Sequence, residues 1–277
     1  MKGNRSISRK VRNEVFRIMR AIQSKSSRFM KFDNVLYHYT KFESALKIIA
    51  SEHLLFSQIE NLNDINEATG PNILFSNKED SEAVLEIIKD YGQISFTIDG
   101  KKKGYDIPAM WGHYADRGKG VCVVLDREKI LINIEKAHYW KGEIKYVGIE
   151  NPAEYFYDKL KFHKPEDFIY YSKETLFFHK SADWSYEQEF RILNFGPPTE
   201  VVDIHNCIKA IILCYHKHDT FKESAEYKAF KMIGLPVFRY FPLFGEGELY
   251  DEAGDSLRPP LTYNFANIKN IFEVEED

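Results

Sequence analysis

Short runs of continuous or alternating apolar residues recur along the chain and predict β-strands. The run CIKAIILCY at 207–215 is the most strand-like, because apolar residues fill almost every position. VCVVLD at 121–126 has the same character and indicates a buried strand. Further strands are expected at 34–40, 54–58, 93–98, 143–149 and 236–241.

A second group of segments repeats apolar residues every three or four positions, which predicts helices. In KFESALKIIASEHL, Phe42, Ala45, Leu46 and Ile49 have this spacing. Helices are also expected at 78–91, 152–162, 166–180 and 219–233, and a loop or short helix at 109–120. Strands and helices are interleaved irregularly, without internal repeats, so we expect an α+β fold.

The segment DWSYEQEFRIL at 183–193 alternates in a way that predicts one extended strand. Tyr186 and Phe190 would then face the core, while Glu187, Glu189 and Arg191 would share the opposite face. Two acids on one strand face are compatible with a salt-bridged structural strand. They are equally compatible with a cleft that uses neighbouring carboxylates, and we favour this second interpretation.

Charge is distributed unevenly and suggests how the chain is organised. Residues 1–31 contain ten Lys or Arg and the single acid Glu14, a local charge of +9, so the remainder of a chain with net charge -4 carries -13. Apolar residues in this arm have helical spacing, which predicts a basic amphipathic helix. Such a helix can meet nucleic acid, an anionic membrane or an acidic partner, or dock on its own protein. We expect this arm at 1–31, a single domain at 32–272 and an acidic tail at 273–277.

Several classes of protein are excluded by what the sequence lacks. It has no apolar run of 18 residues, no apolar leader segment, and three cysteines without a CxxC pair. We therefore expect a cytoplasmic protein that does not enter a membrane. The common phosphate-loop, dinucleotide, zinc-protease and serine-hydrolase motifs do not occur. CYHKHD at 214–219 has no second cluster with metal-ligand spacing, so we expect no metal.

Two aromatic segments are candidates for a binding pocket. His38 lies among tyrosines in YHYT, and MWGHYADRGKG places Trp111 and Tyr114 beside glycines. Aromatic rings next to flexible backbone are common in pockets for flat ligands, and also in ordinary cores.

Four segments in this order resemble a bacterial family of unknown function that is grouped by fold with ADP-ribosyltransferases. They are YHYT (37–40), NLNDINEA (61–68), MWGHYADRGKGVCVVLD (110–126) and KSADWSYEQEFRI (180–192). The family has YHYT, NDPxE, MWxHYA and WxYExE blocks, and the resemblance covers about residues 35–245. It implies an ADP-ribosyltransferase-like fold, in which helices flank a split mixed β-sheet core.

The resemblance also implies roles for individual residues. His38 and Thr40 look like the His-Gly-Thr block whose histidine holds a ribose hydroxyl of NAD, with Tyr39 in place of glycine. ISFT at 94–97 is similar to the Ser-Thr-Ser strand that supports such sites. Glu189 matches the essential second glutamate of the Glu-x-Glu turn, and Glu187 matches the first. The residues expected to contact NAD are His38, Tyr39, Thr40, Ser95, Trp111, Tyr114 and Arg191, and the catalytic pair is Glu189 and Glu187. Arg191 can either clamp the pyrophosphate of NAD or hold the neighbouring acids ionised.

Residue chemistry agrees with this expectation. Cleavage of the nicotinamide–ribose bond develops positive charge on the ribose, which a fixed carboxylate stabilises. A second carboxylate can orient or deprotonate the acceptor. The sequence thus predicts an NAD-dependent ADP-ribosyltransferase that modifies a nucleic acid or protein, as a toxin or anti-phage effector with a neutralising antitoxin-type partner. The alternatives are an NAD glycohydrolase with the same pocket, and a non-catalytic module that binds a nucleotide or nucleic acid.

Overall fold

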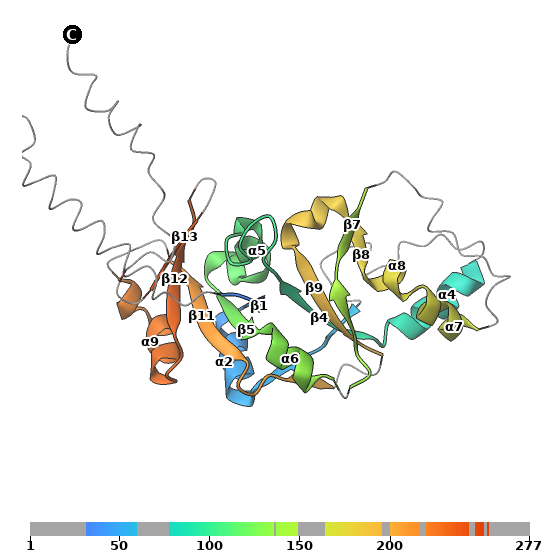
Figure 1. The fold of residues 1–277 in the computed structure, drawn as a ribbon, viewed down its shortest axis with the longest axis horizontal. Helices are drawn as coiled ribbons and strands as arrows, with labels where there is room; N and C mark the ends of the chain where they lie inside the picture. Colours follow the sequence, from blue (N-terminus) through green and yellow to red (C-terminus); the bar gives the residue numbers. More distant parts are fainter. Residues whose placement is uncertain are drawn as a thin grey trace, which may run out of the picture.

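A large mixed β-sheet is the centre of the computed structural model, with helices on both of its faces (Figure 1). The structure describes residues 32–59, 78–135, 137–148, 164–195, 200–215, 220–243, 247–251 and 254. Their mixed α/β content agrees with the α+β prediction. The predicted basic arm, the NLNDINEA block, the predicted helix at 152–162 and the acidic tail lie outside the described residues.

Nine strands form the main sheet, in the order β13-β12-β11-β5-β1-β4-β9-β6, with β3 also paired to β4. Its strands are β1 (Val35–Thr40), β3 (Ser57–Gln58), β4 (Gly92–Thr97), β5 (Val121–Asp126), β6 (Trp140–Glu143), β9 (Glu189–Asn194), β11 (Ile208–Cys214), β12 (Val237–Phe241) and β13 (Glu248–Tyr250). Two small sheets pair β2 (His53–Leu55) with β10 (Val201–Asp203), and β7 (Lys145–Val147) with β8 (His179–Ser181). The β11–β12 and β7–β8 pairs are parallel, and the other pairs are antiparallel.

The helices divide between the two faces and one end of the main sheet. The α-helices are α2 (Phe42–Ser51), α4 (Lys78–Ile88), α5 (Pro108–Tyr114), α6 (Arg127–Asn133), α7 (Pro165–Tyr171), α8 (Lys173–Phe177) and α9 (Ala225–Met232). Short 3-10 helices are η2 (Asp116–Gly118), η5 (Ala182–Glu187) and η6 (Phe221–Glu223). In Figure 1, α2, α6 and α9 lie below the sheet, α5 lies above it, and α4, α7 and α8 lie at the β6 end.

The strand β5 shows why its sequence is a continuous apolar run. Val121, Val123 and Leu125 pack into the core on the side of α2 and α6, whereas Cys122 and Val124 pack on the side of α5. All five side chains are fully buried. A central strand that is covered on both faces needs apolar residues at every position, not at alternate ones.

The main sheet narrows at the contact between β1 and β4. β1 has a partner on β5 for all six of its residues, but it pairs with β4 at Tyr37 and Thr97. β4 in turn pairs with β9 along six residues. Two well-paired blocks of strands therefore meet at a short junction, and this junction positions the site described below.

The structure corrects the prediction of a single strand at 183–193. Residues Ala182–Glu187 form η5, and the strand β9 begins only at Glu189. The Ser181 side chain accepts a hydrogen bond from the Asp183 amide and starts the 3-10 turn. Gln188 follows with a left-handed φ of 47°. Glu187 and Glu189 are therefore neighbours across a corner, and only Glu189 and Arg191 share a strand face.

Other boundaries also differ from the predictions. The helix expected at 166–180 is replaced by α7 and α8, and its last two residues belong to the strand β8. The helix expected at 219–233 is realised as η6 and α9. The strand expected at 143–149 is divided between the end of β6 and β7. The strands expected at 34–40, 93–98, 121–126, 207–215 and 236–241 are confirmed, with no boundary shifted by more than one residue.

Candidate functional site

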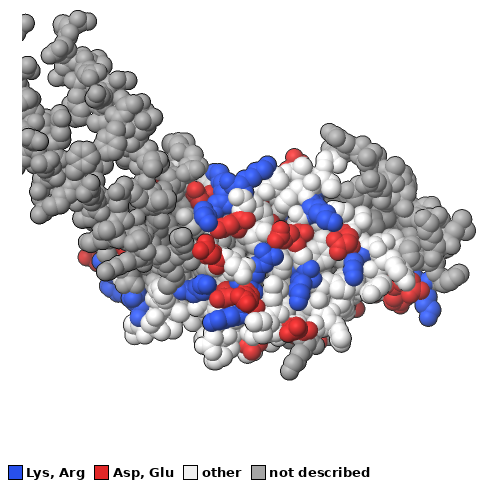
Figure 2. Space-filling view, in the orientation of Figure 1, with Lys and Arg blue, Asp and Glu red and all other residues white. Residues whose placement is uncertain are grey.

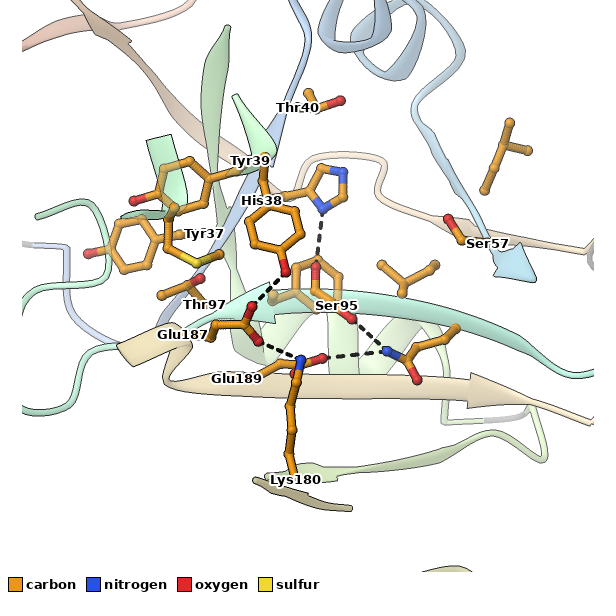
Figure 3. A pocket seen from close by; sticks show the side chains of 16 residues that line it. Tyr37, His38, Tyr39, Thr40, Ser57, Ser95, Thr97, Lys180, Glu187 and Glu189 are labelled. Carbon is orange, nitrogen blue, oxygen red and sulfur yellow. Dashed lines mark hydrogen bonds and ion pairs between the residues drawn. The ribbon is translucent and has the colours of Figure 1, made fainter. Parts of the chain in front are cut away.

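A cavity of about 310 Å³ lies where β1 and β4 separate (Figure 3). Its walls come from β1, β4, the first residue of β9, α5, β8 and the end of η5, with one residue each from β2 and β3. This volume is at the lower end for small-molecule sites and suits a nucleoside-sized group. Seven of the nine predicted site residues line the cavity: His38, Tyr39, Thr40, Ser95, Tyr114, Glu187 and Glu189.

The two acids at the cavity are buried and belong to one network of charges. Lys180 Nζ lies 2.7 Å from Glu187 Oε2 and 3.5 Å from Glu189 Oε2 (Figure 3). Tyr114 donates its hydroxyl to Glu187 Oε1 at 2.6 Å. Glu187, Glu189 and Lys180 are each at most 5% exposed. Several charges are thus held in a region from which bulk water is largely excluded.

Arg191 lies behind Glu189 and fixes it from the strand β9. Its Nε and a terminal guanidinium nitrogen donate to the two carboxylate oxygens of Glu189 at 2.6 and 2.8 Å, a bidentate pair. Its other terminal nitrogen donates to the Phe177 carbonyl at 2.8 Å. Arg191 is 2% exposed and is not part of the cavity wall. Of the two roles expected for Arg191, the structure shows the contact that holds a neighbouring acid ionised, and it places Arg191 outside the cavity wall.

The surroundings of the two acids affect their pKa values in opposite directions. Burial alone would raise the pKa of Glu189, but the charge and hydrogen bonds of Arg191, together with Lys180, hold it at about 2. For Glu187, burial raises the pKa above its usual value; Lys180 opposes this rise and Glu189 adds to it. Two carboxyl groups whose pKa values are separated in this way are suited to different tasks, one as a fixed anion and one as a proton acceptor.

The histidine of the YHYT block occupies the opposite side of the cavity from these acids (Figure 3). His38 Nδ1 is 3.3 Å from the Ser95 carbonyl oxygen, and its ring is tilted against Phe96. Burial lowers the pKa of His38, so its imidazole is neutral near pH 7. A neutral imidazole held through Nδ1 has its second nitrogen available for a ligand hydroxyl.

Two of the predicted aromatic contacts contribute to the core. Trp111 is 3% exposed, donates to the Tyr105 carbonyl at 2.8 Å and stacks on Tyr240 with ring centroids 5.3 Å apart. The structure thus places Trp111 behind the cavity and not on its wall. The Tyr39 hydroxyl donates to the Gly104 carbonyl at 2.6 Å, and its ring packs edge-on against Trp111. Tyr39 therefore lines the cavity, while its hydroxyl is used in a structural hydrogen bond to Gly104.

Sequence analysis did not identify two polar residues of the cavity, Gln93 and Lys180. Gln93 Nε2 donates to Ser95 Oγ at 2.8 Å and lies 3.5 Å from Glu189 Oε1. Among the described residues, the buried atoms Gln93 Oε1 and Thr97 Oγ1 have no hydrogen-bond partner. Unsatisfied buried polar atoms are costly, and a polar ligand in the cavity would offset this cost. Gln93, Ser95 and Thr97 alternate along a predicted strand, a signal that could have identified Gln93; a lone lysine before a turn offered no comparable signal for Lys180.

Metal ligation and membrane insertion have no structural support in the residues that the structure describes. In those ranges no group of three or more His, Cys, Asp or Glu is placed to hold a metal ion. His216, His218 and Asp219 of the CYHKHD segment lie outside them. No helix in the same ranges has the length and apolar character needed to cross a bilayer.

Residues 110–192 match the family described as "Protein of unknown function (DUF2971)". This segment contains Tyr114, Lys180, Glu187, Glu189 and Arg191, so the match covers the acidic side of the cavity. The match supports the resemblance to an uncharacterised domain family.

A curated relative is "Uncharacterized protein R372" of Acanthamoeba polyphaga mimivirus. It is 29% identical over 130 residues, which cover 40% of this chain and 52% of the relative. The chain thus spans about half the length of this relative. No solved structure matches the chain.

Proposed function

We propose that this protein is an NAD-dependent ADP-ribosyltransferase that transfers ADP-ribose to a macromolecular acceptor, nucleic acid or protein. The observation that carries the proposal is a buried Glu189, paired with Arg191, beside a second buried carboxyl group, Glu187, at a cavity of nucleoside size. A toxin or anti-phage effector, paired with a neutralising antitoxin-type partner, is the biological role that the resemblance implies.

The arrangement of the strands supports the proposal. The resemblance singles out His38, Ser95 and Glu189, and these residues come from β1, β4 and β9, which are adjacent in the main sheet. All three line one cavity, although 151 residues separate His38 from Glu189 in the sequence. The narrow β1–β4 junction also agrees with the expectation of a split sheet.

In the proposed reaction the bond between the ribose C1 and the nicotinamide nitrogen breaks, and its electron pair leaves with nicotinamide. Glu189 stabilises the positive charge that develops on the ribose; because Arg191 already fixes it, its carboxylate needs no reorganisation. The acceptor forms a bond to C1 and loses its proton to Glu187. His38 and Ser95 hold ribose hydroxyls, while the unsatisfied oxygens of Gln93 and Thr97 bind polar groups of the ligand.

The acceptor class is open within the proposal. On the face seen in Figure 2, basic and acidic side chains are interspersed and no large patch of one sign is visible. A polyanion such as nucleic acid is favoured by extended basic patches, whereas mixed charges suit a protein surface equally well. This face therefore does not discriminate between the two acceptors.

An NAD glycohydrolase is the second candidate, and the burial of Glu187 favours it. Glu187 is 3% exposed, so a small acceptor such as water reaches its carboxylate more easily than a side chain or a base does. In this case water takes the place of the acceptor, and the roles of the other residues are unchanged.

NAD labelled in its adenylate half tests the proposal and separates the candidates. Incubation with cell lysate is expected to transfer label to macromolecules, and sensitivity of the product to nuclease or protease identifies the acceptor class. Release of free labelled ADP-ribose alone would indicate the glycohydrolase. If neither product forms while NAD binds, the protein is a non-catalytic nucleotide-binding module and the enzymatic proposal is wrong.

Binding of NAD is expected to raise the melting temperature, because a ligand that binds only the folded state stabilises it by mass action. Replacement of His38 by Ala removes a cavity-lining group without altering the charge network, so it should reduce this shift at each NAD concentration. Thermal unfolding with and without millimolar NAD measures the effect. The partly exposed His53, which belongs to β2 and does not line the cavity, offers the control His53→Ala, whose shift should equal that of the wild type. No shift for the wild type would remove NAD as the ligand.

A further inference from the structure

Lys180 is a buried lysine with a position that neither the sequence nor the proposed reaction explains. Its side chain is 5% exposed, and its ammonium group lies between the two carboxylates (Figure 3). The ammonium group is also 4.8 Å from the centre of the Trp184 ring. Removal of a charged amine from water costs several kcal/mol unless close counter-charges compensate for it. Burial of Lys180 therefore has a cost in free energy, and its contacts with the two carboxylates indicate its role.

The partner that depends on Lys180 is Glu187, not Glu189. Glu189 already has a bidentate guanidinium partner in Arg191. The Lys180 ammonium is 2.7 Å from Glu187 but 3.5 Å from Glu189. The ionisable groups that interact with Glu187 are Tyr114 from α5, Tyr146 from β7, Lys180 from β8, Tyr186 from η5 and Glu189 from β9. Within this described set, Lys180 is the cation that directly contacts the Glu187 carboxylate.

The small β7–β8 sheet holds Lys180 in this position. β8 is parallel to β7, with Tyr146 and Lys180 as register partners, so their side chains extend to the same face. The Tyr146 hydroxyl accepts a hydrogen bond from the Glu189 amide at 2.9 Å, while Lys180 contacts both acids. Tyr146 and Lys180, which are neighbours in the β7–β8 sheet, thus both contact the segment that carries Glu187 and Glu189.

We propose that Lys180 is a positioning residue that holds Glu187 as an anion, oriented to take the proton of the acceptor. This inference rests on the proposed function for the identity of the reaction, but the charge relation between Lys180 and Glu187 is independent of it. In the transfer step the proton passes from the acceptor to Glu187, the acceptor bonds to C1, and Lys180 keeps its own protons. Without the ammonium group, burial and the nearby Glu189 charge favour the protonated form of Glu187, which cannot act as a base.

The direct test is a pH titration of Glu187 in the ligand-free protein. NMR of protein labelled with ¹³C at the glutamate carboxyl groups monitors the titration, and the Glu187→Gln variant identifies the signal of Glu187. Lys180→Met removes the charge that favours ionised Glu187, so the pKa of Glu187 should rise by at least about one unit. Lys180→Arg restores a cation and should return the titration towards that of the wild type. Lys145→Met is the matched control, since Lys145 lies on the neighbouring strand β7 with its side chain 65% exposed; it should leave the titration unchanged.

The pH profile of transfer provides the functional measurement. The rate falls at low pH as Glu187 becomes protonated, and Lys180→Met should move this acidic limb to higher pH by the same amount as the titration. A role in stability alone would lower the rate at every pH without moving the limb. If Lys180→Met does not fold, Lys180→Gln keeps a hydrogen-bond donor without the charge and is measured in its place.

The outcomes separate this inference from the proposed function. An unchanged Glu187 titration in Lys180→Met or Lys180→Gln overturns the role of Lys180, whatever the activity of the protein. A shifted titration, in a protein that forms no product from NAD, supports the charge relation and refutes the proposed reaction. A shifted titration with an acidic limb that stays in place would show that Glu187 is not the base.

Discussion

Replacement of Glu189 by Gln should abolish both ADP-ribose transfer and NAD hydrolysis, with a loss of at least about 100-fold. This magnitude is typical for removal of one preorganised electrostatic group. Gln keeps the shape of the side chain and its carbonyl oxygen can still accept a hydrogen bond from Arg191, but it lacks the charge that stabilises the ribose cation. Turnover of labelled NAD measures the loss, and the NAD-induced thermal shift should persist.

The control for this variant is Glu143→Gln. Glu143 belongs to β6, which is adjacent to β9, but its side chain is 56% exposed and pairs with Arg127 at the surface. The Glu143→Gln variant should retain wild-type activity.

Glu187→Gln should reduce transfer more than hydrolysis, because water is a small and abundant acceptor that depends less on orientation. Full activity in both Glu189→Gln and Glu187→Gln would mean that the acids are structural. Loss of activity in Glu187→Gln alone would mean that Glu187, and not Glu189, is the essential acid.

Replacement of Arg191 by Met should destabilise the protein by about 3–5 kcal/mol, since it leaves the buried Glu189 without its bidentate partner. Urea unfolding provides the measurement. The double variant Glu189→Gln with Arg191→Met should recover part of this loss, because no uncompensated anion then remains at position 189. The interaction free energy between Arg191 and Glu189 is the difference between the effect of the double variant and the sum of the two single effects.

A surface pair supplies the comparison for Arg191. Arg127 contacts Glu143 at 2.9 Å, with side-chain exposures of 26% and 56%, so Arg127→Met should cost no more than about 1 kcal/mol. Equal destabilisation by Arg191→Met and Arg127→Met would contradict the inference that the Arg191–Glu189 pair is a buried support of the site.

The site could be predicted in part, because several of its residues belong to distinctive local segments. His38, Ser95, Glu187 and Glu189 were identified, and the structure brings all four to one cavity. Trp111 and Arg191 lie behind the cavity wall, and Arg191 fulfils one of its two expected roles by holding Glu189 ionised. Aromatic and basic residues occur in cores and in pockets alike, and only packing against Tyr240 and Glu189 distinguishes the two locations.

The error at 183–193 shows where local periodicity fails. Alternation predicted a strand that contained Glu187, but η5 and the left-handed Gln188 interrupt it. The Gln188 amide donates to the Ile98 and Lys102 carbonyls at 2.7 and 2.9 Å and accepts from the Lys102 amide. These three bonds to a loop about 90 residues earlier stabilise the corner. A window of neighbouring residues contains no information about such partners.

The sequence by itself determined the strands and helices with strong periodicity, the α+β class and the segments that carry the two acids, because local side-chain patterns encode these features. Tertiary structure alone decided the narrow β1–β4 junction, the corner between Glu187 and Glu189, and the position of Lys180 between them. The physical reason is that charge and burial act through space. Lys180 and Tyr146 are 34 residues apart in the chain, yet parallel pairing of β7 with β8 makes them neighbours. Burial raises the pKa of Glu187, whereas Arg191 outweighs burial and lowers the pKa of Glu189, and both influences also act through space.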